Sequence, residues 1–328
     1  MNKRYLVTGA AGFIGSQVCL RLLEEGHQVS GVDNLNDYYD VRLKDWRLSQ
    51  IQSHPNSENF HFEKMDIENQ RSLDCFFGSN GPFDAVLNLA ARAGVSYSLQ
   101  NPHVYLSTNA EGTLNLLECM RETGCKKFVY ASTSSLYAGQ MMPFTEELAV
   151  NEPLSPYAAS KKAGELMAYS YHKLYQIDIS VVRYFTVFGP AGRPDMSIFR
   201  FIKWIYEGAP IQIFGDGSQS RDFTYVDDIA RGTIAAIQDV GYEIFNLGGG
   251  RNPVSLNTII SRLEELLGKK AKINHKPFHV ADLMETWADI SKAKRLLDWE
   301  PQISLEEGFK KSVQWYMDNR HWLKEVKV

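Results

Sequence analysis

Residues 5–15 read Tyr5-Leu6-Val7-Thr8-Gly9-Ala10-Ala11-Gly12-Phe13-Ile14-Gly15, a short apolar run followed by three glycines in GxxGxxG spacing. The apolar run has the composition of a buried strand, and the glycines follow it directly. Glycine permits a tight turn and close backbone approach, and the turn leads into a helix whose first amides favour an anion. This order predicts a strand, a phosphate-binding turn and a helix at the start of the chain.

The first two-thirds of the chain alternates strand-like and helix-like segments. The strands are expected at Tyr5–Thr8, Gln28–Val32, Asn59–Met65, Ala85–Leu89, Lys127–Ser132 and Ile179–Arg183. The helices are expected at Phe13–Glu25, Pro102–Thr123 and Pro156–Tyr175. Apolar strands that alternate with helices predict an α/β fold, a Rossmann-type, doubly wound parallel sheet with both faces covered.

After about residue 186 this rhythm changes, and turn clusters with glycine and proline become frequent. We expect residues 186–225 and 253–328 to form a smaller, interleaved α/β lobe that binds substrate. Residues 1–185 are expected to form the dinucleotide-binding domain, with a segment at about 226–252 returning to it. The elements expected here are helices Ser197–Glu207 and Ser255–Leu267, strand Tyr242–Leu247 and a frayed tail at Trp322–Val328.

Composition excludes several functional classes. The 328 residues carry a net charge of −4, so no global basic field would attract nucleic acid. No apolar run approaches the length of roughly 18 residues that a membrane span needs. The four cysteines show no CxxC spacing, and no signal peptide is expected before the first strand. These features predict a cytoplasmic protein without a bound metal, membrane or nucleic-acid partner.

An acidic residue stands where the second predicted strand ends. Asp33 follows Gly15 by 18 residues, and a carboxylate there can accept hydrogen bonds from adenosine ribose hydroxyls. The same charge would repel a 2′-phosphate, which favours NAD over NADP. The alternative is that Asp33 caps a turn. Asp66 and Ile67, after the third strand, are expected to contact the adenine edge.

The helix that starts near residue 156 places a tyrosine and a lysine on one face. Ser155 is suited to cap this helix, and Pro156 to its first turn. Tyr157 and Lys161 are then one turn apart, and the ammonium group would lower the pKa of the phenol. Such a tyrosine can take a proton from a substrate hydroxyl while hydride leaves its carbon. The alternative is an exposed aromatic beside a solvated lysine.

A hydroxyl cluster precedes this pair by about two dozen residues. It reads Ala131-Ser132-Thr133-Ser134-Ser135 and follows a predicted strand. A hydroxyl there can share the proton with Tyr157, although Ser/Thr clusters also suit ordinary turns. Glycine turn, Asp33, hydroxyl cluster and YxxxK occur in order after the expected strands, and the combination indicates nicotinamide-dependent hydride transfer more specifically than any single motif does.

These motifs resemble those of the extended short-chain dehydrogenases/reductases, in the nucleotide-sugar epimerase/dehydratase group. Further matching segments are Asn88–Ala91, Ala131–Tyr137 and Arg221–Val226. The resemblance implies Thr133, Tyr157 and Lys161 as the catalytic set and NAD as the cofactor. The motifs and the resemblance together suggest that NAD is bound by Gly9, Gly12, Phe13, Ile14, Gly15, Asp33, Asn34, Asp66, Ile67, Leu89, Ala90, Ala91, Ala131, Tyr157, Lys161, Tyr184 and Val187.

The position beside the catalytic hydroxyl narrows the reaction type. Dehydratases and decarboxylases of this group carry a carboxylate next to that hydroxyl, whereas this chain has Ser134 and Ser135. Hydride removal and return needs no such acid, which favours epimerisation. Residues 184–196, Tyr184 to Met196, resemble the UDP-glucuronate 4-epimerases. The departures from the sequences of that group are Arg92 and Ser96, in the segment after the fourth strand, and Ala191.

A uronic acid substrate needs groups that hold its carboxylate. Arg193 is one candidate, with a loop-stabilising ion pair as its alternative role. Ser134, Ser135 and Thr186 are candidates for neutral hydrogen bonds to the same carboxylate. Arg221, which has a local salt bridge as its alternative role, and Asp282 are expected on the diphosphate and uridine side.

The sequence leaves three functions open. The first is 4-epimerisation of UDP-glucuronate to UDP-galacturonate through a 4-keto intermediate. The second is a UDP-glucose/galactose 4-epimerase or another nucleotide-sugar epimerase. The third is a non-catalytic NAD-sensing protein on the same fold, which the presence of both Tyr157 and Lys161 disfavours. The resemblance also implies a homodimer that pairs the helices at 102–123 and 156–175.

Overall fold

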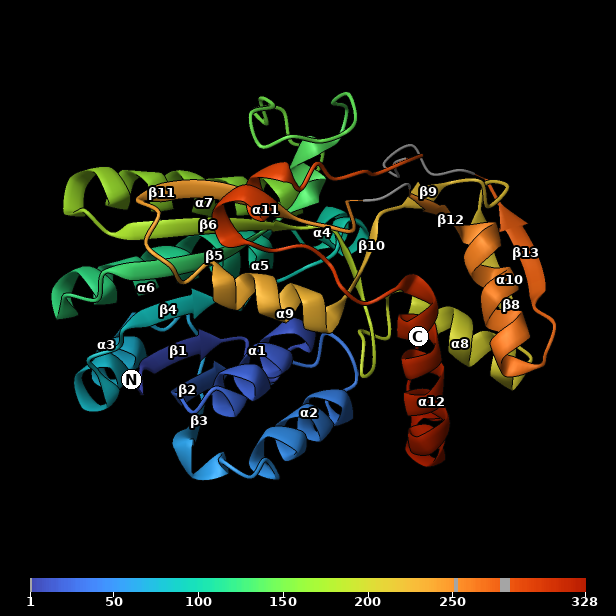
Figure 1. The fold of residues 1–328 in the computed structure, drawn as a ribbon, viewed down its shortest axis with the longest axis horizontal. Helices are drawn as coiled ribbons and strands as arrows, with labels where there is room; N and C mark the ends of the chain where they lie inside the picture. Colours follow the sequence, from blue (N-terminus) through green and yellow to red (C-terminus); the bar gives the residue numbers. More distant parts are fainter. Residues whose placement is uncertain (1, 251–252, 278–283) are drawn as a thin grey trace.

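A computed structural model describes residues 2–250, 253–277 and 284–328, and its centre is one parallel sheet (Figure 1). Seven strands lie in the order β11-β6-β5-β4-β1-β2-β3, and every neighbouring pair is parallel. Their bounds are β1 Arg4–Thr8, β2 Gln28–Asp33, β3 Phe60–Lys64, β4 Ala85–Asn88, β5 Lys127–Thr133, β6 Asp178–Tyr184 and β11 Tyr242–Leu247. The predicted doubly wound α/β fold is confirmed. The strand order reverses between β1 and β4, where such sheets bind ligands at their carboxyl ends.

Helices cover both faces of the sheet because its central strands are buried on both sides, whereas the edge strand β3 alternates apolar and polar residues. Leu6 and Val7 of β1 are fully buried, yet they belong to different apolar clusters on opposite faces. One face carries α1 (Phe13–Glu24), which packs against α2 (Arg42–Gln52) and α9 (Val226–Ala235). The other face carries α3 (Gln70–Asn80), α6 (Gly112–Thr123) and α7 (Pro156–Tyr175).

The helix expected at Pro102–Thr123 is interrupted by a wider turn. It consists of α5 (His103–Leu106), a π-helical turn at Ser107–Glu111 and α6. The turn carries Asn109, which is fully buried and donates to Ser160 Oγ of α7 at 2.9 Å. π-Helical turns often re-aim a side chain near a functional site, and this one ties α6 to the helix that carries Tyr157 and Lys161.

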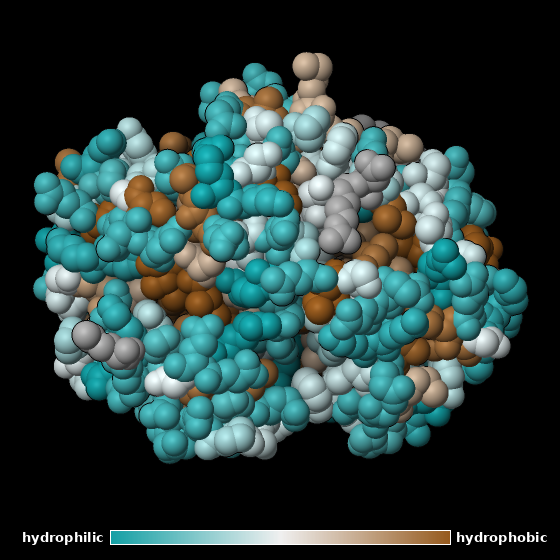
Figure 2. All heavy atoms as spheres, viewed as in Figure 1, coloured by the Kyte–Doolittle hydropathy of each residue, from teal (hydrophilic) through white to brown (hydrophobic). Residues whose placement is uncertain are grey.

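The smaller elements gather beside the carboxyl ends of the strands, on the right of Figure 1. Three two-stranded sheets occur there: β7 with β10, β9 with β12, and β8 with β13. The strands are β7 Thr186–Phe188, β8 Pro210–Phe214, β9 Ser220–Arg221, β10 Phe223–Tyr225, β12 Val254–Ser255 and β13 Lys272–Lys276. The helices include α8 Ser197–Glu207, α10 Leu256–Leu267, α11 Ser291–Leu297 and α12 Leu305–Leu323, and α4 spans Val95–Gln100. Figure 2 shows a mostly hydrophilic surface on this side of the molecule, with apolar side chains in separate small areas.

The C-terminal tail is docked, so the prediction of a frayed tail was wrong. Leu323 and Val326 are buried in the apolar cluster of the smaller elements. Lys203 Nζ of α8 donates to the Leu323 and Lys324 carbonyl oxygens at 2.8 and 2.7 Å. These bonds satisfy carbonyls at the end of α12, and a lysine suits the negative end of a helix.

Two further features follow from the described residues. None of their helices combines the length and the apolar character that a membrane span requires. All four cysteines are free thiols, and the described part of the chain contains no group of three or more His, Cys, Asp and Glu side chains able to share a metal ion.

Candidate active site

The glycine turn between β1 and α1 has no room for side chains. Gly9 has a φ of +69°, and a Cβ there would lie 2.8 Å from the Leu89 carbonyl oxygen. A Cβ on Gly15 would lie 2.1 Å from Gly9 O. Gly12 stands at the N-cap without a side chain to bond the first amides of α1. The turn therefore presents backbone and a helix N-terminus to a ligand, which fits a pyrophosphate.

The acidic side chains predicted for the adenosine side meet at the ends of β2 and β3. Asp33 is buried; its carboxylate accepts from Ala11 N at 3.2 Å and Leu35 N at 2.8 Å. Asp66 accepts from Asn34 Nδ2 at 2.7 Å. Lys44 Nζ lies 3.6 Å from Asp33 Oδ1, a buried partner that no sequence motif indicated. Asp33 ends β2 and Asp66 follows β3, so both lie at the carboxyl ends of neighbouring strands.

The other predicted cofactor residues lie at the carboxyl ends of the next strands. Ala90 N, after β4, donates to Thr8 Oγ1 at 3.1 Å, which holds that segment against β1. Tyr184 ends β6, and its hydroxyl pairs with Thr233 Oγ1 at 2.8 Å. The glycine turn, Asp33 and these strand ends form one continuous edge of the sheet, and their chemistry fits an extended dinucleotide. The remaining residues on or beside this edge are Phe13, Ile14, Ile67, Leu89, Ala91, Ala131 and Val187.

The tyrosine of the YxxxK motif stands beside two groups that modify its acidity. Tyr157 lies in the first turn of α7, where Ser155 Oγ accepts from Ala158 N at 3.1 Å. Burial raises the pKa of Tyr157, whereas a hydrogen bond with Thr133 and the charge of Arg193 lower it, and the net direction is upward. Thr133 ends β5, so strand and helix together position the phenol.

Lys161 is buried one turn further along α7. Its Nζ lies 4.4 Å from the centroid of the Tyr130 ring, a cation–π contact. Burial lowers the pKa of Lys161 to about 7, and the carboxylate of Glu165 opposes that shift. A lysine held this way changes charge near neutral pH, whereas the groups that lower the pKa of Tyr157 in the structure are Thr133 and Arg193.

A buried ion pair that the sequence motifs did not indicate fixes α7 to the sheet. Glu165 accepts from Arg183 Nε and Nη2 at 2.9 and 2.8 Å and from Ser132 Oγ at 2.7 Å. Arg183 Nη1 also donates to Tyr137 Oη at 2.8 Å, and that hydroxyl donates to Asn246 Oδ1 at 2.8 Å. The network joins β5, β6 and β11 to the helix that carries Tyr157.

Glu165→Gln is expected to destabilise the fold strongly. Removing one partner of a buried ion pair leaves the other charge uncompensated, at a cost of about 3–5 kcal/mol. The free energy of unfolding in urea measures this loss, with Glu306→Gln as the control. Glu306 forms an exposed pair with Lys310 at 3.6 Å, whose loss should cost less than about 1 kcal/mol. Equal stabilities of the two variants would contradict the role of the network.

Arg193 forms an ion pair within its own loop. Its Nε and Nη2 donate to the Asp195 carboxylate at 3.0 and 2.6 Å, and its guanidinium lies 5.6 Å from the Tyr38 ring centroid. The loop-stabilising pair that was left open from the sequence is therefore present. The same guanidinium is close enough to Tyr157 to lower the pKa of that phenol. The loop thus places a cation near Tyr157.

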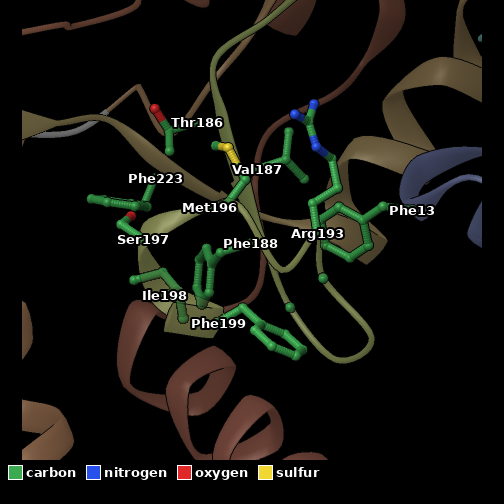
Figure 3. A pocket seen from close by; sticks show the side chains of 12 residues that line it. Phe13, Thr186, Val187, Phe188, Arg193, Met196, Ser197, Ile198, Phe199 and Phe223 are labelled. Atoms are coloured by element: carbon green, nitrogen blue, oxygen red, sulfur yellow. The ribbon is translucent and has the colours of Figure 1, made fainter. Parts of the chain in front are cut away.

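One cavity brings the predicted carboxylate-binding loop to the start of α1 (Figure 3). Its lining includes Phe13 from α1, Thr186 from β7 and Arg193 from the following loop. Ser134 and Ser135 lie in a short 3₁₀ turn, Ser134–Tyr137, where Ser135 N donates to Thr133 Oγ1 at 3.1 Å. The cavity therefore brings Thr186 and Arg193 together, whereas Ser134 and Ser135 are not among its lining residues and lie beside Thr133.

Of the two residues predicted for the nucleotide side, the structure describes Arg221 but not Asp282. Arg221 in β9 is half-buried, and its Nη1 donates to Ser220 O at 2.8 Å. Asp282 lies outside the described residues. Arg92, one of the departures in sequence, bonds through its backbone to Asn109: its N–H donates to Oδ1 at 2.8 Å, and its carbonyl accepts from Nδ2 at 2.9 Å.

Comparison with known proteins agrees with this geometry. Residues 5–248 match the model of the NAD dependent epimerase/dehydratase family. A UDP-glucuronate 4-epimerase of Thermodesulfobacterium geofontis is 63% identical over 324 residues, which cover 99% of each chain.

Two solved structures are similar over nearly their whole length. One is a UDP-glucuronic acid 4-epimerase from Bacillus cereus in complex with UDP-glucuronic acid and NAD. It has a TM-score of 0.89 and 38% identity, and the match covers 96% of this chain and 99% of that one. The other is a UDP-glucose 4-epimerase from Thermotoga maritima with UDP-glucose, with a TM-score of 0.86, 33% identity and coverage of 97% and 99%. The family predicted from the motifs is confirmed, and the chain belongs to the NAD dependent epimerase/dehydratase family.

Proposed function

We propose that this protein catalyses the NAD-dependent 4-epimerisation of UDP-glucuronate to UDP-galacturonate. The observation that carries the proposal is the position of Tyr157, beside the Thr133 hydroxyl, one turn from buried Lys161 and close to Arg193. The full-length similarity to UDP-glucuronate 4-epimerases supports the choice of substrate.

The first chemical step is a proton transfer at the sugar 4-hydroxyl. Tyr157, as the phenolate, accepts the O4 proton, and the Thr133 hydroxyl orients O4 by hydrogen bonding. In its protonated form, Lys161 favours the phenolate of Tyr157, since an ammonium one turn away stabilises negative charge on the phenol. NAD, when held by the glycine turn and Asp33, would supply the acceptor for the C4 hydride and its donor for return to the opposite face of the ring.

The residues around the sugar then have to let the 4-keto sugar rotate without releasing it. After the 4-keto sugar turns about its diphosphate, Tyr157 returns the proton to O4 and becomes the phenolate again. Gly9, Gly12 and Gly15 would hold the NAD pyrophosphate, and Asp33 the adenosine ribose. We assign the uridine diphosphate to the smaller lobe, residues 186–225 and 253–328, with Arg221 and Asp282 as its ligands.

A 4-keto uronate is a β-keto acid and loses CO2 readily when its carboxylate aligns with the ketone. Thr186, Ser134, Ser135 and Arg193 are proposed to hold the carboxylate out of that alignment. Thr186→Val is expected to raise the share of UDP-pentose by-product or to weaken substrate binding, because it removes one hydrogen bond worth about 1 kcal/mol. Product analysis and KM measure both effects. An unchanged product ratio with unchanged KM would remove Thr186 from this assignment.

The activity is tested directly by incubating the protein with UDP-glucuronate and resolving the products by NMR. The proposal expects a mixture of UDP-glucuronate and UDP-galacturonate without added reductant. Parallel incubation with UDP-glucose separates this function from that of a UDP-glucose/galactose 4-epimerase. Turnover of UDP-glucose alone would overturn the choice of substrate, and turnover of neither sugar would overturn the enzyme assignment.

A homodimer is proposed on the exposed apolar side chains of α5 and α7. Leu106, Leu166, Met167 and Leu174 are between 39% and 69% exposed, and the two helices contact each other. Apolar side chains grouped on neighbouring helices favour burial against a second copy. A cytoplasmic location is proposed from the free thiols.

Leu166→Glu is therefore expected to shift the protein from dimer to monomer in sedimentation velocity, since a charge in an apolar interface is costly. Leu296→Glu, at a 39% exposed leucine on α11, is the control and should leave the sedimentation coefficient unchanged. A wild-type protein that sediments as a monomer at micromolar concentration would contradict the dimer.

A further inference from the structure

Arg47, a fully buried arginine outside all the motifs, connects the glycine turn to the loop at residues 189–193. Arg47 lies in the middle of α2 and is 1% exposed. Its guanidinium packs 5.9 Å from the Phe13 ring centroid and 5.4 Å from that of Tyr39. Phe13 opens α1 directly after the glycine turn, so Arg47 lies immediately behind the expected cofactor loop.

The guanidinium donates to backbone carbonyls of both loops. Nη1 donates to Ala11 O in the glycine turn at 3.1 Å and to Tyr39 Oη at 2.6 Å. Nε and Nη2 donate to Ala191 O at 3.0 and 2.6 Å, and Nη2 also reaches Gly192 O at 3.4 Å. All five N–H groups of the fork have acceptors, and their fixed planar geometry sets the distance between the two loops.

The surroundings of Arg47 indicate more than a stabilising role. No carboxylate forms an ion pair with it within the part of the chain that the structure describes, so its buried charge is compensated by carbonyl and hydroxyl oxygens. A buried charge without a counter-ion usually costs stability. Ala191, whose carbonyl takes two of these bonds, has a φ of +52°, a strained conformation for a residue other than glycine. Arg47 thus holds in place a loop conformation that the backbone alone disfavours.

The held loop leads directly to the charge that faces the catalytic tyrosine. Arg193 follows Gly192, and its charge lowers the pKa of Tyr157. The other groups near this phenol are Thr133 and Tyr130 of β5 and the Tyr105 ring of α5, whose centroid lies 6.0 Å away; Lys161 lies one turn further along the same helix. A shift of the 189–193 loop would therefore change the acidity of Tyr157 without any change in α7.

We propose that Arg47 is a positioning residue that keeps the glycine turn and the 189–193 loop in one register, so that the cofactor and the sugar meet at Tyr157. The proposal rests on the proposed function for its catalytic part. Its structural part, the hold on the glycine turn, does not depend on which sugar is the substrate.

Arg47→Lys tests the proposal because lysine keeps the charge but lacks the fork. We expect kcat/KM for UDP-glucuronate to fall at least about tenfold, the loss produced by about 1.4 kcal/mol. We expect the acid limb of the kcat/KM–pH profile to move to higher pH, because a displaced Arg193 no longer favours the phenolate. The rise in Tm that added NAD causes should also become smaller. Arg42→Gln, at an exposed arginine of the same helix paired with Asp40 and Glu325, is the control and should leave all three quantities at wild-type values.

An unchanged pH limb and an unchanged NAD response in Arg47→Lys would overturn the proposal, even with a lower Tm, because that pattern is purely structural. If Arg47→Lys does not fold, Tyr39→Phe decides, since it removes a single partner of Nη1. Tyr39→Phe is expected to move the acid limb of the kcat/KM–pH profile to higher pH and to reduce the rise in Tm with NAD, each by less than Arg47→Lys would. A pH limb and an NAD response equal to those of the wild type would overturn the proposal. A wild-type protein without epimerase activity would sink the proposed function alone, because the NAD response still reports on the glycine turn.

Discussion

Tyr157→Phe is expected to lower kcat for UDP-glucuronate by about a thousandfold, within the range of 10²–10⁴ that general acid–base groups contribute. The substitution removes only the oxygen that exchanges the proton with O4. Phenylalanine keeps the ring and its edge contact with Tyr105, whose centroid lies 6.0 Å away, so the fold and the first turn of α7 should be unaffected. Initial rates from product NMR and the amount of NAD retained by the purified protein are the measurements.

The matched control is Tyr169→Phe, further along the same helix at a 46% exposed position where the ring packs against Tyr242. It should retain wild-type kcat. The decisive pattern is a large loss of kcat in Tyr157→Phe with NAD retention equal to wild type. A loss below about tenfold would mean that another group takes the proton.

Lys161→Met is expected to lower kcat by about a hundredfold or more, because Tyr157 then loses the cation that favours its phenolate. Methionine has a similar volume and fills the space over the Tyr130 ring. Lys173→Met, at an exposed lysine near the end of α7, is the control and should keep wild-type activity. Activity in Lys161→Met close to that of the control would contradict the role of the ammonium group.

Buried Lys161 is also expected to make the stability of the protein depend on pH. Burial lowers the pKa of Lys161 from 10.5 to about 7, so between these values the unfolded chain binds more protons than the folded one. Wild-type stability should therefore gain from this residue as pH rises through that window, and be penalised below it. At pH 6 Lys161→Met should unfold at a Tm equal to or above that of wild type, and its advantage should shrink toward pH 10. A Tm well below wild type at pH 6 would contradict this account of the buried charge.

Much of the fold was predictable from the sequence because the relevant signals are local. Apolar runs, the glycine turn and the Ser155-Pro156 helix start each involve a few adjacent residues, and the strands and helices that they predict are present within a few positions. The wider π-helical turn at Ser107–Glu111 was missed, because its hydrogen-bond pattern does not alter the apolar periodicity that indicates a helix.

The residues proposed for the site are found from the sequence where they belong to motifs, and are not found where they depend on distant partners. Thr133 and Tyr157 lie together because β5 and α7 are adjacent, and Lys161 lies one turn further along α7. Arg47 donates to carbonyls 36 and 144 residues away, and backbone acceptors leave no pattern in a sequence. Glu165 likewise pairs with an arginine 18 residues away on the neighbouring strand β6. Arg193 was identified, but its ion pair with Asp195 depends on the loop conformation.

The central claim is that C4 of the sugar loses and regains its own hydrogen while Tyr157 moves only the hydroxyl proton. UDP-glucuronate carrying deuterium at C4, incubated in ordinary water, tests this most directly. The account predicts UDP-galacturonate with the deuterium still at C4, because hydride stays with the bound cofactor until it returns. UDP-galacturonate whose C4 carries hydrogen from the solvent would contradict it.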